Sequence, residues 1–360
     1  MPISFDMNLL LILFTFIVSF LLCFLTVPGV MVLAKRVGAM DIPKDKRRMH
    51  TEPIPRLGGL AIYIGFLVAV LLFCPTITPA LRGILIGSVM MIVIGVMDDI
   101  NALPALPKLL VQIVAAVVVV LHGVVITYFE NPFPFGPENF QLGWFAYPVT
   151  VLWIVGVTNA INLIDGLDGL AAGISSIASV SIFIIAWLTS APEIALIMAA
   201  LCGACFGFLP YNYNPAKIFM GDTGALFLGF ILASVSISGL FKSSALVSVA
   251  VPFLVLGLPI YDVLFAIGRR VLKHQPIMQP DRGHLHHRLI DMGLSQRQVV
   301  TILYSVSGTL GLSAIILATG LSGRAFALMF LLLALTVLEF YLLRWDAKKQ
   351  KEEVLEDEEG

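Results

Sequence analysis

Five aspartates stand where long apolar stretches of this chain end, close to glycines or amide side chains. They are Asp98, Asp99, Asp165, Asp168 and Asp222. Any one of them could be the solvated end of an apolar helix, but neighbouring carboxylates repel each other unless a cation lies nearby. Carboxylate and amide oxygens favour a hard cation such as Mg²⁺, with Mn²⁺ as the alternative. A magnesium ion that keeps waters and bridges phosphates is the usual centre of a phosphoryl-transfer site.

Four polar side chains recur at every third position of one segment, at Asn159, Asn162, Asp165 and Asp168. Each step of three residues along an α-helix turns by about 300°, so the row drifts by roughly 60° per step. On one unbroken helix the first and last side chains would therefore point to opposite sides. We expect the helix to end near Gly166, because a glycine permits the turn that lets these side chains converge.

A basic segment further along the chain has three histidines in four positions, flanked by arginines. Its side chains are Arg282, His284, His286, His287 and Arg288. The histidine spacing invites a metal site, but zinc is the weaker interpretation without cysteines or an acid at ligand spacing. Arginine and histidine donors suit phosphate or sugar oxygens better. The alternative is a loop that is positive only because it faces the cytoplasm, although that rule requires lysine or arginine rather than histidine.

A second basic segment precedes the second apolar stretch and is punctuated by prolines. Its basic side chains include Arg47, Arg48, His50 and Arg56. Such a segment can bind anionic lipid headgroups without further specificity. It can also guide the phosphate of a lipid substrate that enters from the membrane, and both interpretations stay open here.

The elements that must position these residues are membrane-spanning helices. The chain has 360 residues, is 59% hydrophobic and only 12% charged, and has a mean hydropathy of +0.97, whereas a soluble domain is about 25% charged. A span needs about 20 mostly apolar residues. The spans that we expect are 8–34, 57–74, 80–97, 108–127, 144–161, 168–189, 192–210, 223–241, 245–268, 299–319 and 323–343. The predicted fold is therefore an all-α polytopic membrane protein with eleven helices.

The basic residues predict how these spans are oriented. When alternate connections are assigned to one side, the other side holds only Arg82, Lys242 and Arg324, which leaves nineteen of the 22 basic residues on the first side. That side is cytoplasmic by the positive-inside rule, so the N-terminus lies outside and the C-terminus inside. All five aspartates then fall at the cytoplasmic rim. Asp262 lies inside the ninth span, where we expect it to cap a partner helix or a water pocket.

We expect a single transmembrane domain over residues 1–343 and a charged, disordered cytoplasmic tail over residues 344–360. The net charge of −1 carries no information on nucleic acid or acidic partners. We expect a lipid bilayer around the domain and no nucleic-acid partner.

Several motifs follow one another in an order that resembles a known enzyme family. They are Asp98-Asp99, Lys108 with Gln112, Asn159 through Gly169, Phe219-Met-Gly-Asp222, Pro280-Asp-Arg-Gly-His284-Leu-His286-His287, and the earlier Asp41-x-Pro43 and Pro53-x-Pro55-Arg-x-Gly-Gly. Over nearly its whole length the sequence resembles the polyprenyl-phosphate N-acetylhexosamine-1-phosphate transferases of the WecA/TagO type. Their superfamily includes MraY, the phospho-MurNAc-pentapeptide transferase, and the eukaryotic dolichyl-phosphate enzyme. Eleven spans are what the WecA/TagO branch implies, whereas MraY has ten.

The resemblance implies transfer of a sugar 1-phosphate from a UDP-sugar to undecaprenyl phosphate, with release of UMP. By motif position, Asp222 is implied as a magnesium ligand, and either Asn162 or the pair Asp98 and Asp99 completes the coordination. Asp98 or Asp99 would deprotonate or orient the lipid phosphate, and Lys108 would neutralise phosphate charge. A single in-line displacement and an aspartyl-phosphate intermediate both stay open. We favour the single displacement, because a lipid phosphate is already an anionic nucleophile that mainly needs positioning.

The resemblance also implies the residues that bind the donor. Asp165 and Asp168 would hold the nucleotide, and Asn159 belongs to the same substrate-binding set. The residues that would grip the pyrophosphate and the sugar are Arg282, His284, His286 and His287.

The donor and the pathway are separate questions. The pattern Pro-Asp-Arg-x-His-x-His-His is similar to that of enzymes that use UDP-GlcNAc, which we favour over the muramyl-pentapeptide donor of MraY or another UDP-N-acetylhexosamine. The product would begin a cell-envelope polysaccharide, such as teichoic acid or O-antigen, at the cytoplasmic face of a bacterial plasma (inner) membrane. A homodimer is what the superfamily implies. An ion-coupled transporter is the alternative from another class, but it would carry its acids near the midplane on repeated helices.

Overall fold

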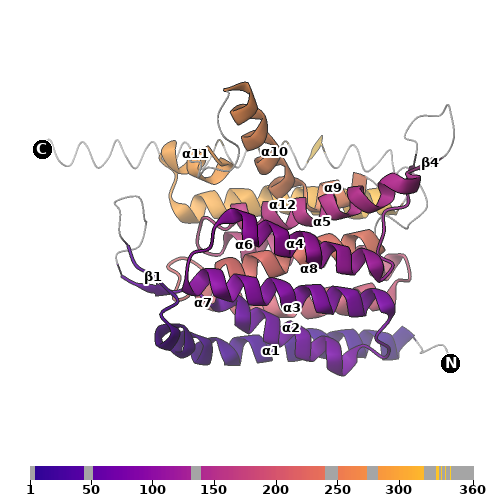
Figure 1. Ribbon diagram of the computed structural model, residues 1–360, viewed down its shortest axis with the longest axis horizontal. Helices are drawn as coiled ribbons and strands as arrows, with labels where there is room; N and C mark the ends of the chain where they lie inside the picture. The colour runs from indigo at the N-terminus through magenta and orange to yellow at the C-terminus, as the bar shows by residue number, and fades with distance from the viewer. Residues whose placement is uncertain are drawn as a thin grey trace, which may run out of the picture.

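Long helices lying side by side form the body of the protein, as a computed structural model shows (Figure 1). The structure describes residues 5–43, 52–130, 139–239, 250–273 and 283–319, together with residues 330, 331, 334, 337 and 341. The last expected span, 323–343, is therefore described only at those five single positions. The expected tail, 344–360, lies outside the described residues.

Helices account for most of the described chain. They are α1 (Phe5–Val37), α2 (Gly58–Phe73), α3 (Pro79–Ile100), α4 (Ala105–Leu121), α5 (Ala146–Ile164), α6 (Leu170–Leu188), α7 (Pro192–Asn212), α8 (Gly221–Gly239), α9 (Ala250–Val255), α10 (Gly257–Leu272), α11 (Leu285–Asp291) and α12 (Gln296–Ala318), with a 3-10 turn at Gly143–Phe145. Among the described residues, seven helices are long and apolar enough to cross a membrane, and α2 and α4 are shorter apolar helices. The chain is thus a mostly helical, polytopic membrane protein, and the helices given above overlap ten of the expected spans.

Two small antiparallel ribbons depart from the all-α prediction. Strand β1 (Met40–Asp41) pairs with β2 (Ile54–Pro55) at one end of the bundle, and β3 (Tyr128–Glu130) pairs with β4 (Asn139–Gln141) at the other end (Figure 1). Strands of two or three residues are too short to show an alternating pattern in a sequence. The β1–β2 ribbon joins the two ends of the proline-punctuated basic segment.

The prediction of one continuous helix over residues 245–268 is wrong. Helix α9 ends at Val255, α10 begins at Gly257, and α10 then stands away from the bundle (Figure 1). Pro259 provides the physical reason, since it has no N–H to donate to Val255 and its ring would clash with that carbonyl in a continuous helix. In the first turn of α10 the same proline is tolerated, because the first N–H groups of a helix have no partner within it.

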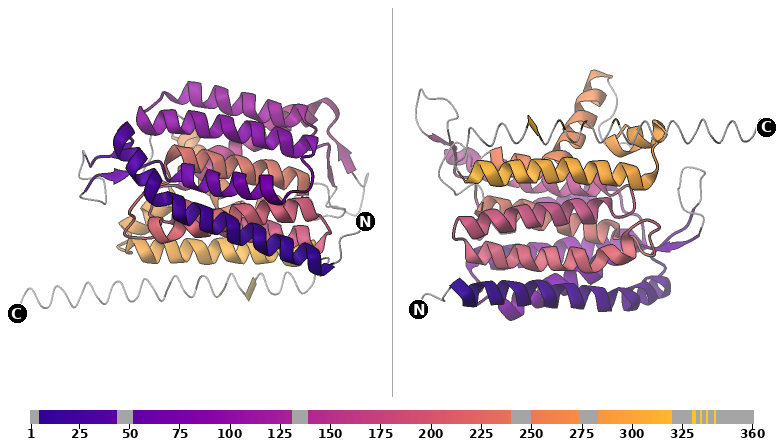
Figure 2. Two further views of the ribbon diagram at one scale, coloured as in Figure 1. Left: turned by 90° about the horizontal axis from the view of Figure 1, so that it is seen from below. Right: turned by 180° about the vertical axis from the view of Figure 1, so that it is seen from behind.

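Helix α8 lies at the centre of the bundle. It packs against α2, α3, α5, α6 and α7, while α1 and α12 lie on opposite faces (Figure 2). Nearly all of its side chains are buried, and Phe227 and Phe230 are fully so. A helix that is apolar and covered on all sides is fixed by several neighbours at once. The first residues of α8, which include Asp222, therefore have a well-defined position.

Glycines bring α2 and α3 close to the start of α8. A Cβ atom at Gly59 would overlap the backbone of Gly224, and one at Gly95 would overlap the backbone of Thr223. The Gly59 N–H also donates to the Met220 carbonyl at 2.8 Å. Small residues at helix contacts allow backbones to approach this closely in membrane proteins. The ends of three helices thereby meet around one point.

This contact generates a stability prediction. Gly95→Ala would push a methyl group into the backbone of Thr223, and we expect it to cost about 1–3 kcal/mol of stability, as overpacking does elsewhere. The apparent melting temperature of the purified protein in detergent measures the effect. Gly156→Ala on α5 is the matched control, because nothing lies within 4 Å of the added methyl. Equal melting of both variants and the parent would contradict the close approach of α3 and α8.

Candidate active site

Three carboxylates from distant parts of the chain form one cluster. Asp98 and Asp99 lie in the last turn of α3, and Asp222 lies in the first turn of α8. An oxygen of each lies within 4.8 Å of an oxygen of the others. Asp98 and Asp99 are buried, with 8% and 4% of their surface exposed. Three like charges at this spacing require compensation by cations.

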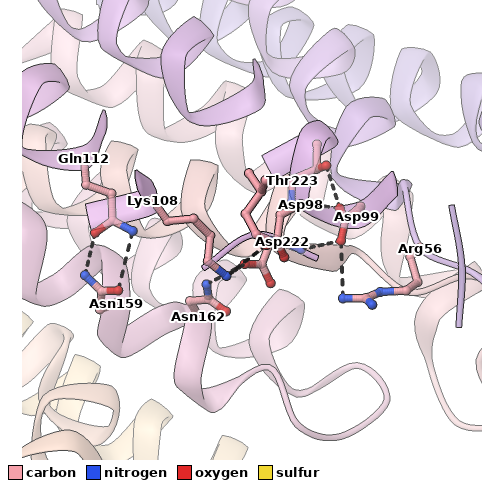
Figure 3. A network of polar contacts seen from close by, with 10 residues as sticks. Arg56, Asp98, Asp99, Lys108, Gln112, Asn159, Asn162, Asp222 and Thr223 are labelled. Atoms are coloured by element: carbon pink, nitrogen blue, oxygen red, sulfur yellow. Dashed lines mark hydrogen bonds and ion pairs between the residues drawn. The ribbon is translucent and has the colours of Figure 1, made fainter. Parts of the chain in front are cut away.

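Asp99 holds the beginning of α8 in place (Figure 3). Its carboxylate accepts the N–H groups of Asp222 and Thr223, both at 3.0 Å, and the Thr223 hydroxyl at 2.7 Å. An Arg56 guanidinium nitrogen lies 3.4 Å from the same carboxylate. A carboxylate at a helix N-terminus binds N–H groups that have no partner within the helix and interacts favourably with the helix dipole. Asp99 therefore connects α3, α8 and the segment that contains Arg56.

Lys108 compensates the negative charges of the other two carboxylates, Asp98 and Asp222 (Figure 3). Its Nζ lies 2.9 Å from an Asp222 oxygen and 3.2 Å from an Asp98 oxygen. The amide of Asn162 donates to the same Asp222 oxygen at 3.3 Å. Asp98 also accepts the N–H of Leu103 at 2.8 Å, which fixes the turn between α3 and α4.

The donor set of this cluster fits a divalent hard cation. Carboxylates supply several oxygens within one ion's reach, and the Asn162 amide, which donates to Asp222, also carries a neutral oxygen. Such ligands suit Mg²⁺, which takes one or two protein carboxylates and completes its coordination with water and phosphate oxygens. The residues Asp98, Asp222 and Asn162 could hold the ion, while Asp99 is already engaged by α8.

Asn159 is occupied by contacts within the protein. Its amide donates to the Gln112 side-chain oxygen at 2.6 Å and to the Val155 carbonyl at 2.8 Å, and it accepts the Gln112 amide at 3.5 Å. Gln112 is buried and lies one helical turn after Lys108. The reciprocal amide pair therefore ties α4 to α5 and fixes the helix that carries the lysine (Figure 3).

The predicted helix end near Gly166 is confirmed. Helix α5 ends at Ile164, and α6 begins after Gly169, which has a φ of +76°. The two aspartates of this turn, Asp165 and Asp168, have different surroundings. Asp168 accepts the amide of Asn214 at 2.9 Å and a backbone N–H of the α7–α8 connection at 3.0 Å. Burial, together with the charges of the acid cluster, raises the pKa of Asp165 to about 8.

The histidines reach the same region from α11. His286 is 2% exposed, and neither ring nitrogen has a hydrogen-bond partner among the described residues. Its ring lies against Gly166, where a Cβ atom would overlap it. Burial lowers the pKa of His286 to about 4, so the ring is neutral at physiological pH. A buried imidazole that has no hydrogen-bond partner in the described part of the chain, and that lies against Gly166, indicates a place where a ligand can supply the missing hydrogen bonds.

The sequence of this chain is similar to those of known proteins. Residues 81–240 match the sequence profile of glycosyl transferase family 4. The chain is 43% identical, over 91% of its length and 91% of the relative's, to a probable undecaprenyl-phosphate N-acetylglucosaminyl 1-phosphate transferase of Bacillus subtilis. It belongs to glycosyl transferase family 4.

Other relatives carry related names. A decaprenyl-phosphate N-acetylglucosaminephosphotransferase of Mycobacterium leprae is 35% identical over 79% of this chain and 78% of its own. A phospho-N-acetylmuramoyl-pentapeptide-transferase of Halalkalibacterium halodurans is 31% identical over 85% of this chain and 97% of its own. Within glycosyl transferase family 4, the N-acetylglucosamine enzymes named here are therefore more similar to this chain than the muramoyl enzyme is.

The structure brings five of the expected family 4 site residues together, and it places others elsewhere. Asp98, Asp99, Lys108, Asn162 and Asp222 are in direct contact or share a partner. Asp168 and Asn159 instead bind other parts of the protein. Arg56, expected as a guide for the lipid phosphate, pairs with Asp99. The remaining expected residues, Arg47, Arg48, His50 and Arg282, lie outside the described part of the chain.

Some contributing residues were missed by the sequence analysis. Thr223 donates to Asp99, and its place beside Asp222 at a helix start was a usable signal. Asn214 and Tyr304 hold the α5–α6 turn through Asp168 and the Gly169 carbonyl. Their partners lie 46 and 135 residues away in sequence, and no local sequence pattern predicts such contacts.

The two adjacent aspartates should differ in their effect on stability. Asp99→Ala leaves two buried N–H groups and a hydroxyl without their acceptor, and we expect a loss of at least about 2 kcal/mol. Asp98→Ala removes one backbone contact and the ion pair with Lys108, but it also relieves repulsion and leaves Lys108 paired with Asp222, so its loss should be smaller. Thermal melting of both purified variants checks this order. A larger loss for Asp98→Ala would contradict the anchoring role of Asp99.

Proposed function

We propose that this chain transfers GlcNAc-1-phosphate from UDP-GlcNAc to undecaprenyl phosphate, giving undecaprenyl-diphospho-GlcNAc and UMP. The observation that carries the proposal is the acid cluster with Lys108 at one end of a membrane helix bundle. At the α5–α6 turn, the buried His286 has no hydrogen-bond partner among the described residues. The name of the Bacillus subtilis relative, a probable undecaprenyl-phosphate N-acetylglucosaminyl 1-phosphate transferase, supports the transferred group and the acceptor. Such a site suits two anionic phosphates that meet at a membrane surface.

Asp98, Asp222 and Asn162 would hold Mg²⁺, with Mn²⁺ as the alternative ion. When bound, the ion supplies charge neutralisation at the phosphate oxygens. Lys108 lies between Asp98 and Asp222, at 3.2 and 2.9 Å, and its ammonium can move onto a phosphate oxygen once a substrate is present. Asp99 keeps Asp222 in position through the α8 backbone. These residues act by positioning and by screening charge, which is what phosphoryl transfer mainly requires.

The chemical step is proposed as a single displacement. An oxygen of the lipid phosphate attacks the β-phosphorus of the UDP-sugar. The bond from that phosphorus to the bridging oxygen breaks, and UMP leaves with the electron pair. Asp98 lies beside Lys108 and orients the lipid phosphate or accepts its proton. No covalent enzyme intermediate is needed, because the attacking oxygen is already anionic.

The donor would be held from the other side by the histidines and by the α5–α6 turn. His284, His286 and His287 come from the start of α11, and Arg282 precedes them in sequence. His286 contacts the turn at Gly166, next to Asp165. We assign the pyrophosphate and the sugar to the histidines, and the nucleotide to the neighbourhood of Asp165.

The proposed topology follows from the placement of these groups. The acids lie at helix ends, since Asp98 and Asp99 close α3, Asp165 follows α5 and Asp222 opens α8. A carboxylate at a helix end avoids most of the cost of burial in hydrocarbon, and this placement argues against an ion-coupled transporter. We propose eleven spans with this end of the bundle, and hence the active site, facing the cytoplasm, in a bacterial plasma membrane. We also propose that the chain forms a homodimer.

The donor is tested with purified protein and undecaprenyl phosphate. We expect UMP release with UDP-GlcNAc and at least about tenfold less with UDP-MurNAc-pentapeptide, since a site shaped for one donor discriminates by this order or more. Release only with the muramyl donor would replace the proposed activity by that of the Halalkalibacterium halodurans relative. Another UDP-N-acetylhexosamine preferred over UDP-GlcNAc would correct the sugar but not the reaction.

The metal is tested by removal and by mutation. Treatment with EDTA should abolish UMP release, and Mg²⁺ should restore it. Asp222→Ala should reduce turnover by about a hundredfold or more, the order expected for a lost group that stabilises developing charge, while the protein stays folded. Glu193→Gln is the control, because Glu193 binds Thr78 near the start of α7, away from the acids. Near-normal turnover of Asp222→Ala at saturating Mg²⁺ would exclude Asp222 as a ligand.

A further inference from the structure

A single buried carboxylate on α10 holds the first part of the histidine segment. Asp262 has 4% of its surface exposed, and both of its oxygens are used. One lies 2.8 Å from the Nδ1 atom of His284, and the other accepts the N–H of Leu285 at 2.8 Å. These partners follow 22 and 23 residues later in the chain. We propose that Asp262 is a positioning residue for the transfer, which sets the tautomer and the orientation of His284.

The contact to Leu285 shows that Asp262 caps a helix from outside. His284 is the N-cap residue of α11 and has extended backbone angles, with no cap from its own side chain. Asp262 supplies the missing acceptor for the first N–H of α11. The expectation that Asp262 caps a partner helix is therefore confirmed. One carboxylate thus fixes the backbone of this segment and one of its side chains.

The contact to His284 decides which ring nitrogen faces a ligand. A carboxylate accepts only, so Nδ1 must carry the proton. Nε2 is then left to accept a hydrogen bond from a donor group of the substrate, such as a sugar hydroxyl, and no described residue takes it. An acceptor on one ring nitrogen that orients the other is a common way to fix an imidazole in a site.

The ring of His284 lies next to the ring of the following histidine, His286. The rings of His284 and His286 are nearly parallel, with centroids 5.9 Å apart and planes 8° apart. His286 in turn lies against Gly166 of the α5–α6 turn. Arg269, two turns further along α10, donates to the Gly283 carbonyl at 2.8 Å. Helix α10 thus holds the histidine segment at two points, and the contact at Asp262 includes an imidazole.

The inference rests on the proposed role of His284 in donor binding, and a double-mutant cycle tests both. Asp262→Asn keeps an oxygen for the Leu285 N–H but presents an amide N–H to Nδ1, which moves the ring proton to Nε2 and removes the charge. We expect the KM for UDP-GlcNAc to rise about tenfold, the order of a charge-assisted hydrogen bond lost, and the KM for undecaprenyl phosphate to stay within about twofold. In the His284→Ala background, Asp262→Asn should add no further rise.

Two further variants keep the test decisive. His284→Gln places an amide donor near the Nε2 position without the Nδ1 contact, and we expect the same rise in donor KM even if Asp262→Asn folds poorly. Glu193→Gln is the matched carboxylate-to-amide control, and thermal melting checks that each variant is folded. A donor KM that stays at the parent value in His284→Gln would overturn the inference.

The outcomes separate the inference from the proposed function. If His284→Ala raises the donor KM but Asp262→Asn does not, His284 binds the donor and Asp262 is only a helix cap. Equal, additive losses from Asp262→Asn in both backgrounds would also reduce Asp262 to a structural role. If His284→Ala leaves the donor KM unchanged, the proposed role of His284 fails, and the inference fails with it.

Discussion

The beginning of α8 is held by a buried carboxylate, and the rest of the candidate site depends on that contact. Asp99 accepts two backbone N–H groups and one hydroxyl from Asp222 and Thr223. These are groups that a helix start cannot satisfy by itself. Because Asp98 precedes Asp99 on α3, the same contact places the Asp98 and Asp222 carboxylates within reach of one cation. The anchor of the central helix and the centre of the chemistry are thus one structural unit.

The cluster also links activity to assembly of the bundle. Its acids come from α3 and α8, its lysine from α4, its arginine from the end of β2, and its amide from α5. Acids buried this close together would repel one another without Lys108 and Arg56. Close packing at Gly59 and Gly95 brings the helices near enough for these contacts. The repulsion among the acids is therefore reduced only when all of these segments are in place.

The histidine half of the site is built differently. It lies beyond α10, which leaves the bundle after the break at Leu256, and it is held by the Asp262 and Arg269 contacts. It returns to the bundle where His286 meets Gly166. The site thus joins a part fixed by surrounding helices to a part held by few polar contacts. A substrate with several phosphates is well suited to bridge the two, because each part supplies positive charge or hydrogen-bond donors.

The sequence by itself determined the membrane class, most of the helices and the residues that gather at the site, because apolar length and a glycine such as Gly166 act locally. The sequence did not determine which of the acids has which role. Asp98 and Asp99 are neighbours in sequence, yet only the fold gives Asp99 to the start of α8 and leaves Asp98 beside Lys108. The tertiary structure alone also decided that Asn159 binds Gln112 and that Asp262 meets His284. The contacts of Asp99, Asn159 and Asp262 join residues 22 or more positions apart, and no local pattern encodes such contacts.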